Sequence, residues 1–381
     1  MIKAIENLPE VSFIDGITLD VVQARLVSYY REKYRQVKGK EITLKAGEPE
    51  MLKLYAVSVI LFQIFEAVEK AGRMDLLKYA YGAFLDNLGA NKGVERLPAQ
   101  AAKTTVRFTL SAPQLSAITI PQGTRVSDGD VLYFATDEAV EIPIGETTVD
   151  VECTCLAAGS DGNGLLPGAV NNLVDLLPYV ESITNVETTA GGADVENDED
   201  FAERIYLAPS GYSVAGSEDA YVYHTRSYSS AVGDVEVTSP SPCVVEIRFL
   251  MADGTLPSAT LISDITERLS AKKIRPLTDQ VRVLTPAEED FGLDLAYYIN
   301  RSDAAKAITI QTEVAKAVED YIAWQTGTIG VDINPSVLTE KVIAAGAKRV
   351  EIVSPTFTPV SAGTVARCSS THITYGGLED D

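Results

Sequence analysis

The stretch TTVRFTL, residues Thr104–Leu110, alternates polar and apolar side chains from Thr105 onward. Val106, Phe108 and Leu110 lie on one face of an extended chain, because successive side chains of a strand point to opposite faces. Such alternation is typical of a strand with one face in a core and the other in solvent. The sequence therefore predicts antiparallel β-structure at this point.

The same pattern continues on the carboxyl side of this strand. Residues 118–136 read as short strands separated by turns at Pro121-Gln122-Gly123 and Asp128-Gly129. Residues 147–164 form another alternating run that ends in the glycine-rich segment GSDGNG. The inward positions of that run are Val149, Val151, Cys153 and Cys155. Dense turns and strict alternation predict a small antiparallel sandwich or barrel over residues 101–190.

Residues 1–97 are expected to form a helical segment. A first helix begins near Leu19 and ends at Gly39, a second begins at Pro49, and a third spans about 74–88 before Gly89. The second helix is apolar on nearly every face and so requires cover all round, which one small bundle cannot supply. We expect other chains to cover it. The candidate residues of this inter-chain bundle are Leu26, Leu54, Val57, Leu61, Ile64, Phe65 and Val68.

Helices and strands alternate after the β region. The pattern predicts two α+β units over 197–285 and 290–365, each with strands packed by helices, and a flexible tail over 366–381. Gly191 and Gly192 are expected to act as a hinge between the β domain and these units. The predicted fold class is therefore multidomain α+β, with a helical bundle segment first and a small antiparallel β domain second.

Composition limits the function. The 381 residues carry a net charge of −22, from 54 acidic and 32 basic side chains, so direct contact with nucleic acid is disfavoured. The most apolar run, 54–65, is shorter than the roughly 20 residues that a bilayer requires, so no membrane insertion is expected. The start of the chain lacks the pattern of a signal peptide. Cys153 and Cys155 have no second Cys or His pair nearby to complete a zinc site, so the four cysteines are expected to be free thiols.

An acidic cluster lies just before the predicted α+β units. Its carboxylates are Asp194, Glu196, Asp198, Glu199 and Asp200. An EF-hand loop counted from Asp194 would need Gly and Glu where the chain has Glu199 and Ile205, so that match fails. Asn197 is instead expected to cap a helix whose first turn carries the acidic residues. Cation binding by the cluster stays open as an alternative.

No catalytic, cofactor-binding or metal-binding residue is assigned. The segment GYSVAG, residues 211–216, resembles a serine-hydrolase elbow, but Ala215 stands where the second glycine belongs. Only two histidines, His224 and His372, could complete a triad, and His224 falls on a helix face suited to packing. Glycine-rich phosphate loops are absent from the sequence. The 54 acidic residues leave a hidden carboxylate pair possible.

Several segments, taken in order, resemble the baseplate J-like proteins of contractile phage tails and related injection particles. The resemblance covers about Tyr81 to Leu250, and the rest of the chain agrees with it in architecture only. Each motif consists of turn-forming residues and is not specific alone. The order of the motifs along the chain makes the resemblance specific. The segments that carry it are residues 81–110, 118–140, 157–164, 191–205, 208–227 and 232–250.

The resemblance implies a non-enzymatic structural role without a cofactor. Family members form wedges, commonly from two copies of this protein and one copy of a second wedge protein, which close into a six-fold ring around a hub. The implied partners also include neighbouring wedges and sheath-proximal proteins. Ring opening is coupled to sheath contraction, and assembly takes place in the bacterial cytoplasm. A tail-associated cell-wall hydrolase and a receptor-binding module remain as alternatives.

Overall fold

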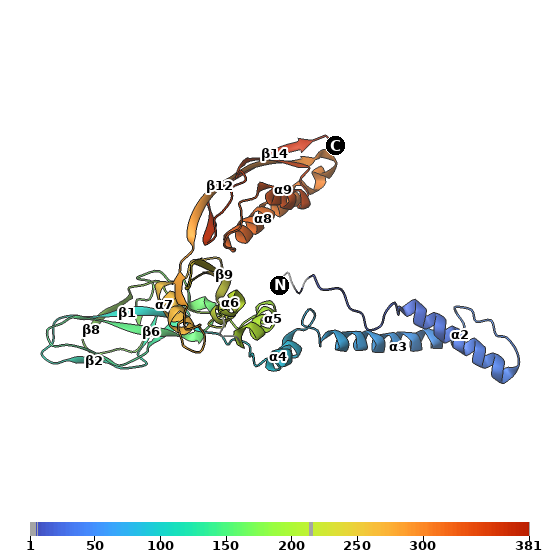
Figure 1. Cartoon of the computed structure of the whole chain (residues 1–381), viewed down its shortest axis with the longest axis horizontal. Helices are drawn as coiled ribbons and strands as arrows, with labels where there is room; N and C mark the ends of the chain where they lie inside the picture. Colours follow the sequence, from blue (N-terminus) through green and yellow to red (C-terminus); the bar gives the residue numbers. More distant parts are fainter. Residues whose placement is uncertain (1–4, 6, 213–215, 381) are drawn as a thin grey trace. The chain divides into compact units, whose positions relative to one another are not determined.

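The structure is a computed structural model that describes residues 5, 7–212 and 216–380 (Figure 1). It contains two compact units. The first consists of Met1–Arg96 and Asn197–Tyr206, and the second consists of Leu97–Glu196 and Leu207–Asp381. The predicted mixture of helices and sheets is confirmed, while the domain boundaries given above stay predictions.

The first unit is built from helices. Helix α2, Leu19–Lys38, begins where the Thr18 side chain accepts a hydrogen bond from Val21 N–H and ends at Gly39, whose φ of 66° is left-handed. Helix α3, Pro49–Arg73, begins with the proline as predicted, because proline tolerates the first helical turn. Both helices are therefore confirmed, the first with both termini and the second with its start.

The third predicted helix is wrong at its start. Helix α4 spans Gly82–Ala90 rather than 74–88, because Tyr81 is extended and Gly82 adopts a left-handed φ of 53°. Gly89 also does not end this helix. A side-chain carbon there would lie 2.6 Å from the Phe201 ring, so the glycine permits close packing against helix α5, Asp198–Leu207. The sequence assigned α5 to the following α+β unit, whereas nearly all of it belongs to the first unit.

The β region forms a nearly closed six-stranded sheet in the order β7-β3-β4-β6-β1-β8, with β2 and β5 paired separately. All these pairings are antiparallel, as predicted. Val106, Phe108 and Leu110 lie in its core with Cys153 and Cys155. The strands are β1 Ala101–Leu110, β2 Ile118–Ile120, β3 Arg125–Ser127, β4 Tyr133–Thr136, β5 Val140–Ile142, β6 Thr148–Ala158, β7 Asn172–Leu173 and β8 Val180–Asn185.

The next part of the second unit packs two helices against a three-stranded sheet. Strand β10 pairs antiparallel with β9 and parallel with β11. Its buried side chains, Ile247 and Phe249, contact Tyr221 of α6 and Ile265 of α7 in one core. The elements are α6 Glu218–Arg226, β9 Val232–Ser241, β10 Val244–Met251, α7 Ala259–Leu269 and β11 Gln280–Leu284.

The last part has the same two-layer construction. Its sheet has the order β13-β12-β14, and the buried face of β12 packs on helices α8 and α9 (Figure 1). The elements are β12 Ala287–Asn300, α8 Ala307–Thr326, α9 Pro335–Ala344, β13 Arg349–Ser354 and β14 Thr364–Glu379. Short 3-10 turns at Ser160–Gly162, Ala208–Tyr212 and Arg301–Lys306 complete the chain.

The predicted flexible tail over 366–381 is wrong for the residues up to 379. Strand β14 pairs in parallel with β12 along nearly its whole length, from Ala287↔Thr364 to Asn300↔Glu379. Val365 and Ala366 are fully buried, so the strand contributes to the core as well as to the sheet. The glycine and acidic composition of the last residues concealed a pairing with a partner far away in the sequence.

Deleting residues 366–381 should therefore destabilise the second unit, because it removes most of a paired strand and the buried Ala366. We expect the Tm in a thermal melt to fall by at least about 5 °C. Deletion of residues 380–381 alone is the control, because the Arg301–Asp380 ion pair is exposed and contributes little. Equal melting temperatures for both truncated chains would contradict the role of β14.

Candidate functional site

Helix α3 exposes most of its apolar surface. Within its 25 residues only Ser58 is buried, and α2 covers part of one side. Ile60 is 59% exposed and Ile64 is 55% exposed. Contiguous apolar surface on a folded chain marks a site of interaction. The other large exposed apolar residues of the helix are Leu52, Val57, Val59 and Val68.

The residues predicted for an inter-chain bundle divide into two groups. Val57, Ile64 and Val68 are exposed and available to a partner. The remaining four, Leu26, Leu54, Leu61 and Phe65, are half-buried. The list of bundle candidates left out Leu52, Val59 and Ile60, which are also exposed, although the helix was expected to be apolar on nearly every face. The bundle itself stays a prediction.

By length and composition, α3 could also cross a membrane, and it is the single such helix among the described residues. The sequence analysis judged this segment by its uninterrupted apolar run, which is shorter than the helix. Only 6% of the most apolar window is buried. Both a surrounding bundle of other chains and a bilayer would cover such a helix.

The acidic residues before and within α5 each have a local structural task. Asp200 N–H donates to the Asn197 side chain at 2.9 Å, which confirms Asn197 as the helix cap. Asp198 accepts from Gly82 N–H at 3.1 Å and from Arg96 at 2.7 Å. The hydrogen bond from Gly82 is the main reason that the pKa of Asp198 is lowered. The cluster therefore fixes the start of α5 to α4.

Two further carboxylates of the cluster bind backbone in the second unit. Asp194 accepts from Ser160 N–H at 2.9 Å and from its hydroxyl at 2.8 Å, and this contact lowers the pKa of Asp194. The buried Glu196 accepts from Leu97 N–H at 3.0 Å. Among residues 5, 7–212 and 216–380, no group of three His, Cys, Asp or Glu side chains could hold a metal ion.

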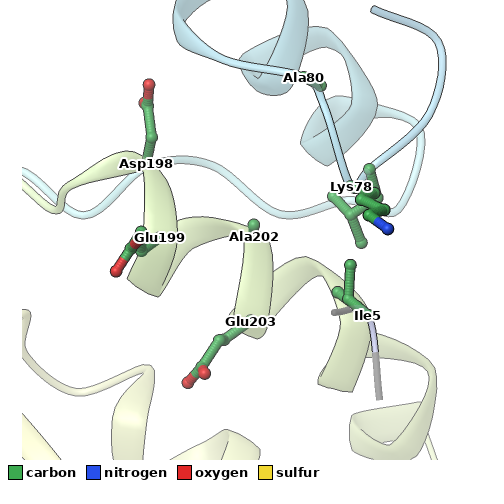
Figure 2. A pocket seen from close by; sticks show the side chains of 8 residues that line it. Ile5, Lys78, Ala80, Asp198, Glu199, Ala202 and Glu203 are labelled. Atoms are coloured by element: carbon green, nitrogen blue, oxygen red, sulfur yellow. The ribbon is translucent and has the colours of Figure 1, made fainter. Parts of the chain in front are cut away.

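A hollow in the first unit is lined by Asp198, Glu199 and Glu203 (Figure 2). It measures about 120 Å³, whereas small-molecule sites usually occupy about 300–1,000 Å³. Figure 2 shows that the carboxylate of Asp198 points away from those of Glu199 and Glu203. These acidic groups do not surround a common point where a substrate or ion would bind.

Gly191 and Gly192 lie in a turn that is held by the motif GSDGNG. The Asn163 amide donates to Gly192 O and its oxygen accepts from Gly192 N–H, both at 2.8 Å. A side-chain carbon on Gly192 would lie 2.4 Å from Gly159 O, so only glycine fits. Gly191 has a φ of 88°, which glycine adopts readily. The turn is fixed in this state, and a hinge role for the two glycines stays a prediction.

The candidate nucleophiles of the sequence are not brought into a catalytic arrangement among the described residues. Ser213 and Ala215 of the elbow-like segment lie outside them. His224 is half-buried beside Tyr223, and burial lowers its pKa. His372 is exposed and hydrogen-bonded to Asp294 at 2.9 Å.

The four cysteines are free, as predicted. Cys153 and Cys155 are buried in the β region, where they fill core volume. Burial raises the pKa of the Cys153 thiol to about 12, so this thiol stays protonated and unreactive at neutral pH.

Because the acidic cluster binds backbone and arginine instead of an ion, removal of divalent cations should not alter stability. We expect the Tm of the chain to be the same within about 1 °C with and without EDTA, since only a bound ligand shifts it. Added calcium serves as the matched condition. A rise in Tm with calcium that EDTA reverses would show that the acidic cluster binds a cation.

Comparison with known proteins identifies two segments of the chain. Residues 105–192 match the Baseplate J-like protein barrel domain, and residues 213–285 match the Baseplate J-like central domain. A cryo-EM structure of the anti-feeding prophage baseplate, 6-fold symmetrised, contains a chain with a TM-score of 0.41 at 12% identity, covering 94% of this chain and 92% of that one. A score of this size does not establish a common fold.

Three curated relatives align with part of the chain. Baseplate protein J of Escherichia phage P2 is 32% identical over 49% of this chain and 62% of its own length. Baseplate protein gp47 of Escherichia phage Mu is 30% identical over 36% of this chain and 37% of its own. Phage-like element PBSX protein XkdT of Bacillus subtilis (strain 168) is 30% identical over 37% of this chain and 36% of its own length. The alignments thus span less than two thirds of each relative, and they agree with the two domain matches: the chain carries segments similar to the barrel and central domains of the baseplate J-like proteins.

Proposed function

We propose that the chain is a structural wedge component in the baseplate of a contractile tail or phage-tail-like injection particle. Two copies assemble with one copy of a second wedge protein, and the wedges close into a six-fold ring around a hub. Opening of this ring accompanies contraction of the sheath. The particle is assembled in the bacterial cytoplasm and carries the protein in its baseplate.

The observation that carries the proposal is the exposed apolar surface of α3 in a chain similar in part to baseplate proteins. Burial of one large aliphatic side chain stabilises an interface by about 1.5–3 kcal/mol, so the exposed valine, leucine and isoleucine residues of α3 favour association strongly. A helical bundle with neighbouring chains would bury them. This cover must come from other chains because α2 shields only one side.

A protein bundle accounts for α3 better than a bilayer does. Helix α2 packs on α3 and carries Arg25, Arg31 and Arg35, and an arginine in the centre of a bilayer is costly. Helices α2 and α3 form a helical hairpin, and this hairpin would have to open before α3 could enter a membrane. A bundle of helices from several chains, by contrast, accepts the hairpin without rearrangement.

A structural role also fits the chemistry of the described residues. The carboxylates of the acidic cluster bind backbone, and the barrel thiols are buried. Neither a cell-wall hydrolase nor a receptor-binding module gains a specific observation in its favour. We therefore propose no enzymatic activity, cofactor or nucleic-acid ligand.

Replacing Ile60 or Ile64 by Asp should prevent wedge assembly without unfolding the isolated chain, because both side chains are exposed there. A carboxylate forced into an apolar bundle should weaken association at least about 30-fold, equivalent to about 2 kcal/mol. The measurement is light scattering after size-exclusion chromatography of the chain co-expressed with its neighbouring wedge protein.

Ile308→Asp is the matched control, because Ile308 is 82% exposed on α8 and lies outside the hairpin. Its complex should form normally. If Ile60→Asp and Ile64→Asp also left the complex intact, the bundle would be excluded. Flotation of the wild-type chain with lipid vesicles, lost in Ile60→Asp, would instead identify α3 as a membrane segment.

A further inference from the structure

Three loops of the β region meet at one end of its strands. Leu110 N–H at the end of β1 donates to Thr147 O at 2.8 Å, and Ser111 N–H donates to Tyr179 O at 3.1 Å. Ile118 at the start of β2 pairs with Ile142 at the end of β5. These contacts bring together loops 111–117, 143–147 and 174–179, which we call the barrel tip.

The barrel tip presents large apolar side chains to solvent from all three loops. Leu115 is 98% exposed, Leu176 is 88% exposed and Ile144 is 66% exposed. Scattered single exposures of this kind are ordinary, but here they converge on one end of the β region. These exposed side chains do not stabilise the isolated chain, because they contribute no buried area to the core.

Tyr179 adds a second, independent feature. Its φ of 70° lies in the left-handed region, which is costly for a bulky side chain, and its ring is 56% exposed. Strained residues persist where the surrounding structure fixes them, and they cluster at functional sites. The hydrogen bond from Ser111 to Tyr179 O fixes this one. Tyrosine is also among the residues enriched in protein interfaces.

The charge at the barrel tip is negative. The three loops contain no lysine or arginine. Glu146 within them, and Glu141 and Glu181 beside them, are exposed and form no ion pair among the described residues. The two arginines of the barrel strands are already paired: Arg107 with Asp150 and Arg125 with Asp175, both at 2.7 Å. An apolar centre is thus bordered by uncompensated carboxylates.

We propose that the barrel tip is a docking surface for another protein of the particle, one that offers an apolar pocket flanked by lysine or arginine. The proposal rests on the function proposed above but concerns a different surface from α3. Charge complementarity selects this occupant, because basic groups would pair with the acidic border while the pocket buries the leucines. The same tip of a second copy, or an anionic lipid surface, would face like charge.

Photocrosslinking in assembled particles tests this directly. Benzoylphenylalanine placed at Leu115 or at Leu176 should crosslink to one other protein of the particle, at an apolar segment bordered by basic residues. The same probe at Leu166 is the control, because Leu166 is 69% exposed near the opposite end of β8 and should give no such product. Crosslinks from the tip to lipid or to a second copy of this chain, or none at all, would overturn the proposal.

Substitutions separate docking from folding. The double variant Leu115→Asp/Leu176→Asp should still form the complex with the second wedge protein. The amount of the crosslinking partner in purified particles should fall at least about tenfold. Tyr179→Gly relieves the backbone strain, so the isolated chain should melt no lower than wild type while the tip partner is still reduced. Unchanged partner content in both variants would exclude docking at the tip. Loss of the wedge complex in the α3 variants alone reports on the proposed function, not on this surface.

Discussion

The chain by itself leaves most of the apolar surface of helix α3 exposed to solvent. Its residues Ile60 and Ile64 are open to solvent in the isolated chain, although the helix has regular termini and a packed partner in α2. Exposed apolar area of this kind lowers solubility and favours association. Association with other chains would bury this area, and the chain is similar in part to proteins that are named as baseplate proteins.

Side-chain hydrogen bonds to backbone fix several turns and helix starts in the rest of the chain. The carboxylates that looked like an ion site instead accept hydrogen bonds from backbone N–H groups, as Asp194 does from Ser160 and Asp198 does from Gly82. Asn163 holds the Gly191-Gly192 turn through both backbone groups of Gly192. Such bonds stabilise connections that would otherwise be loose, because each satisfies a polar group that the turn leaves without a regular partner.

Local patterns in the sequence predicted local structure well. The alternation at Val106 and Phe108 identified β1, and Pro49 and Gly39 marked helix termini, because these signals depend only on adjacent residues. The start of α4 was predicted wrongly because the left-handed Gly82 is stabilised by Asp198, a residue distant in sequence. Strand β14 escaped for the same reason, since its partner β12 is distant too. The exposed side of α3 could be suspected from composition, but which residues α2 covers required the structure.

Native mass measurement of the full chain and of a chain lacking residues 1–96, each with and without the neighbouring wedge protein, tests the central claim most directly. The account predicts a defined hetero-complex with two copies of the full chain. It also predicts that the shortened chain, which retains the barrel and central segments, remains monomeric. A full chain that stays monomeric with its partner present, or a shortened chain that assembles equally well, would contradict the claim that α3 holds the assembly together.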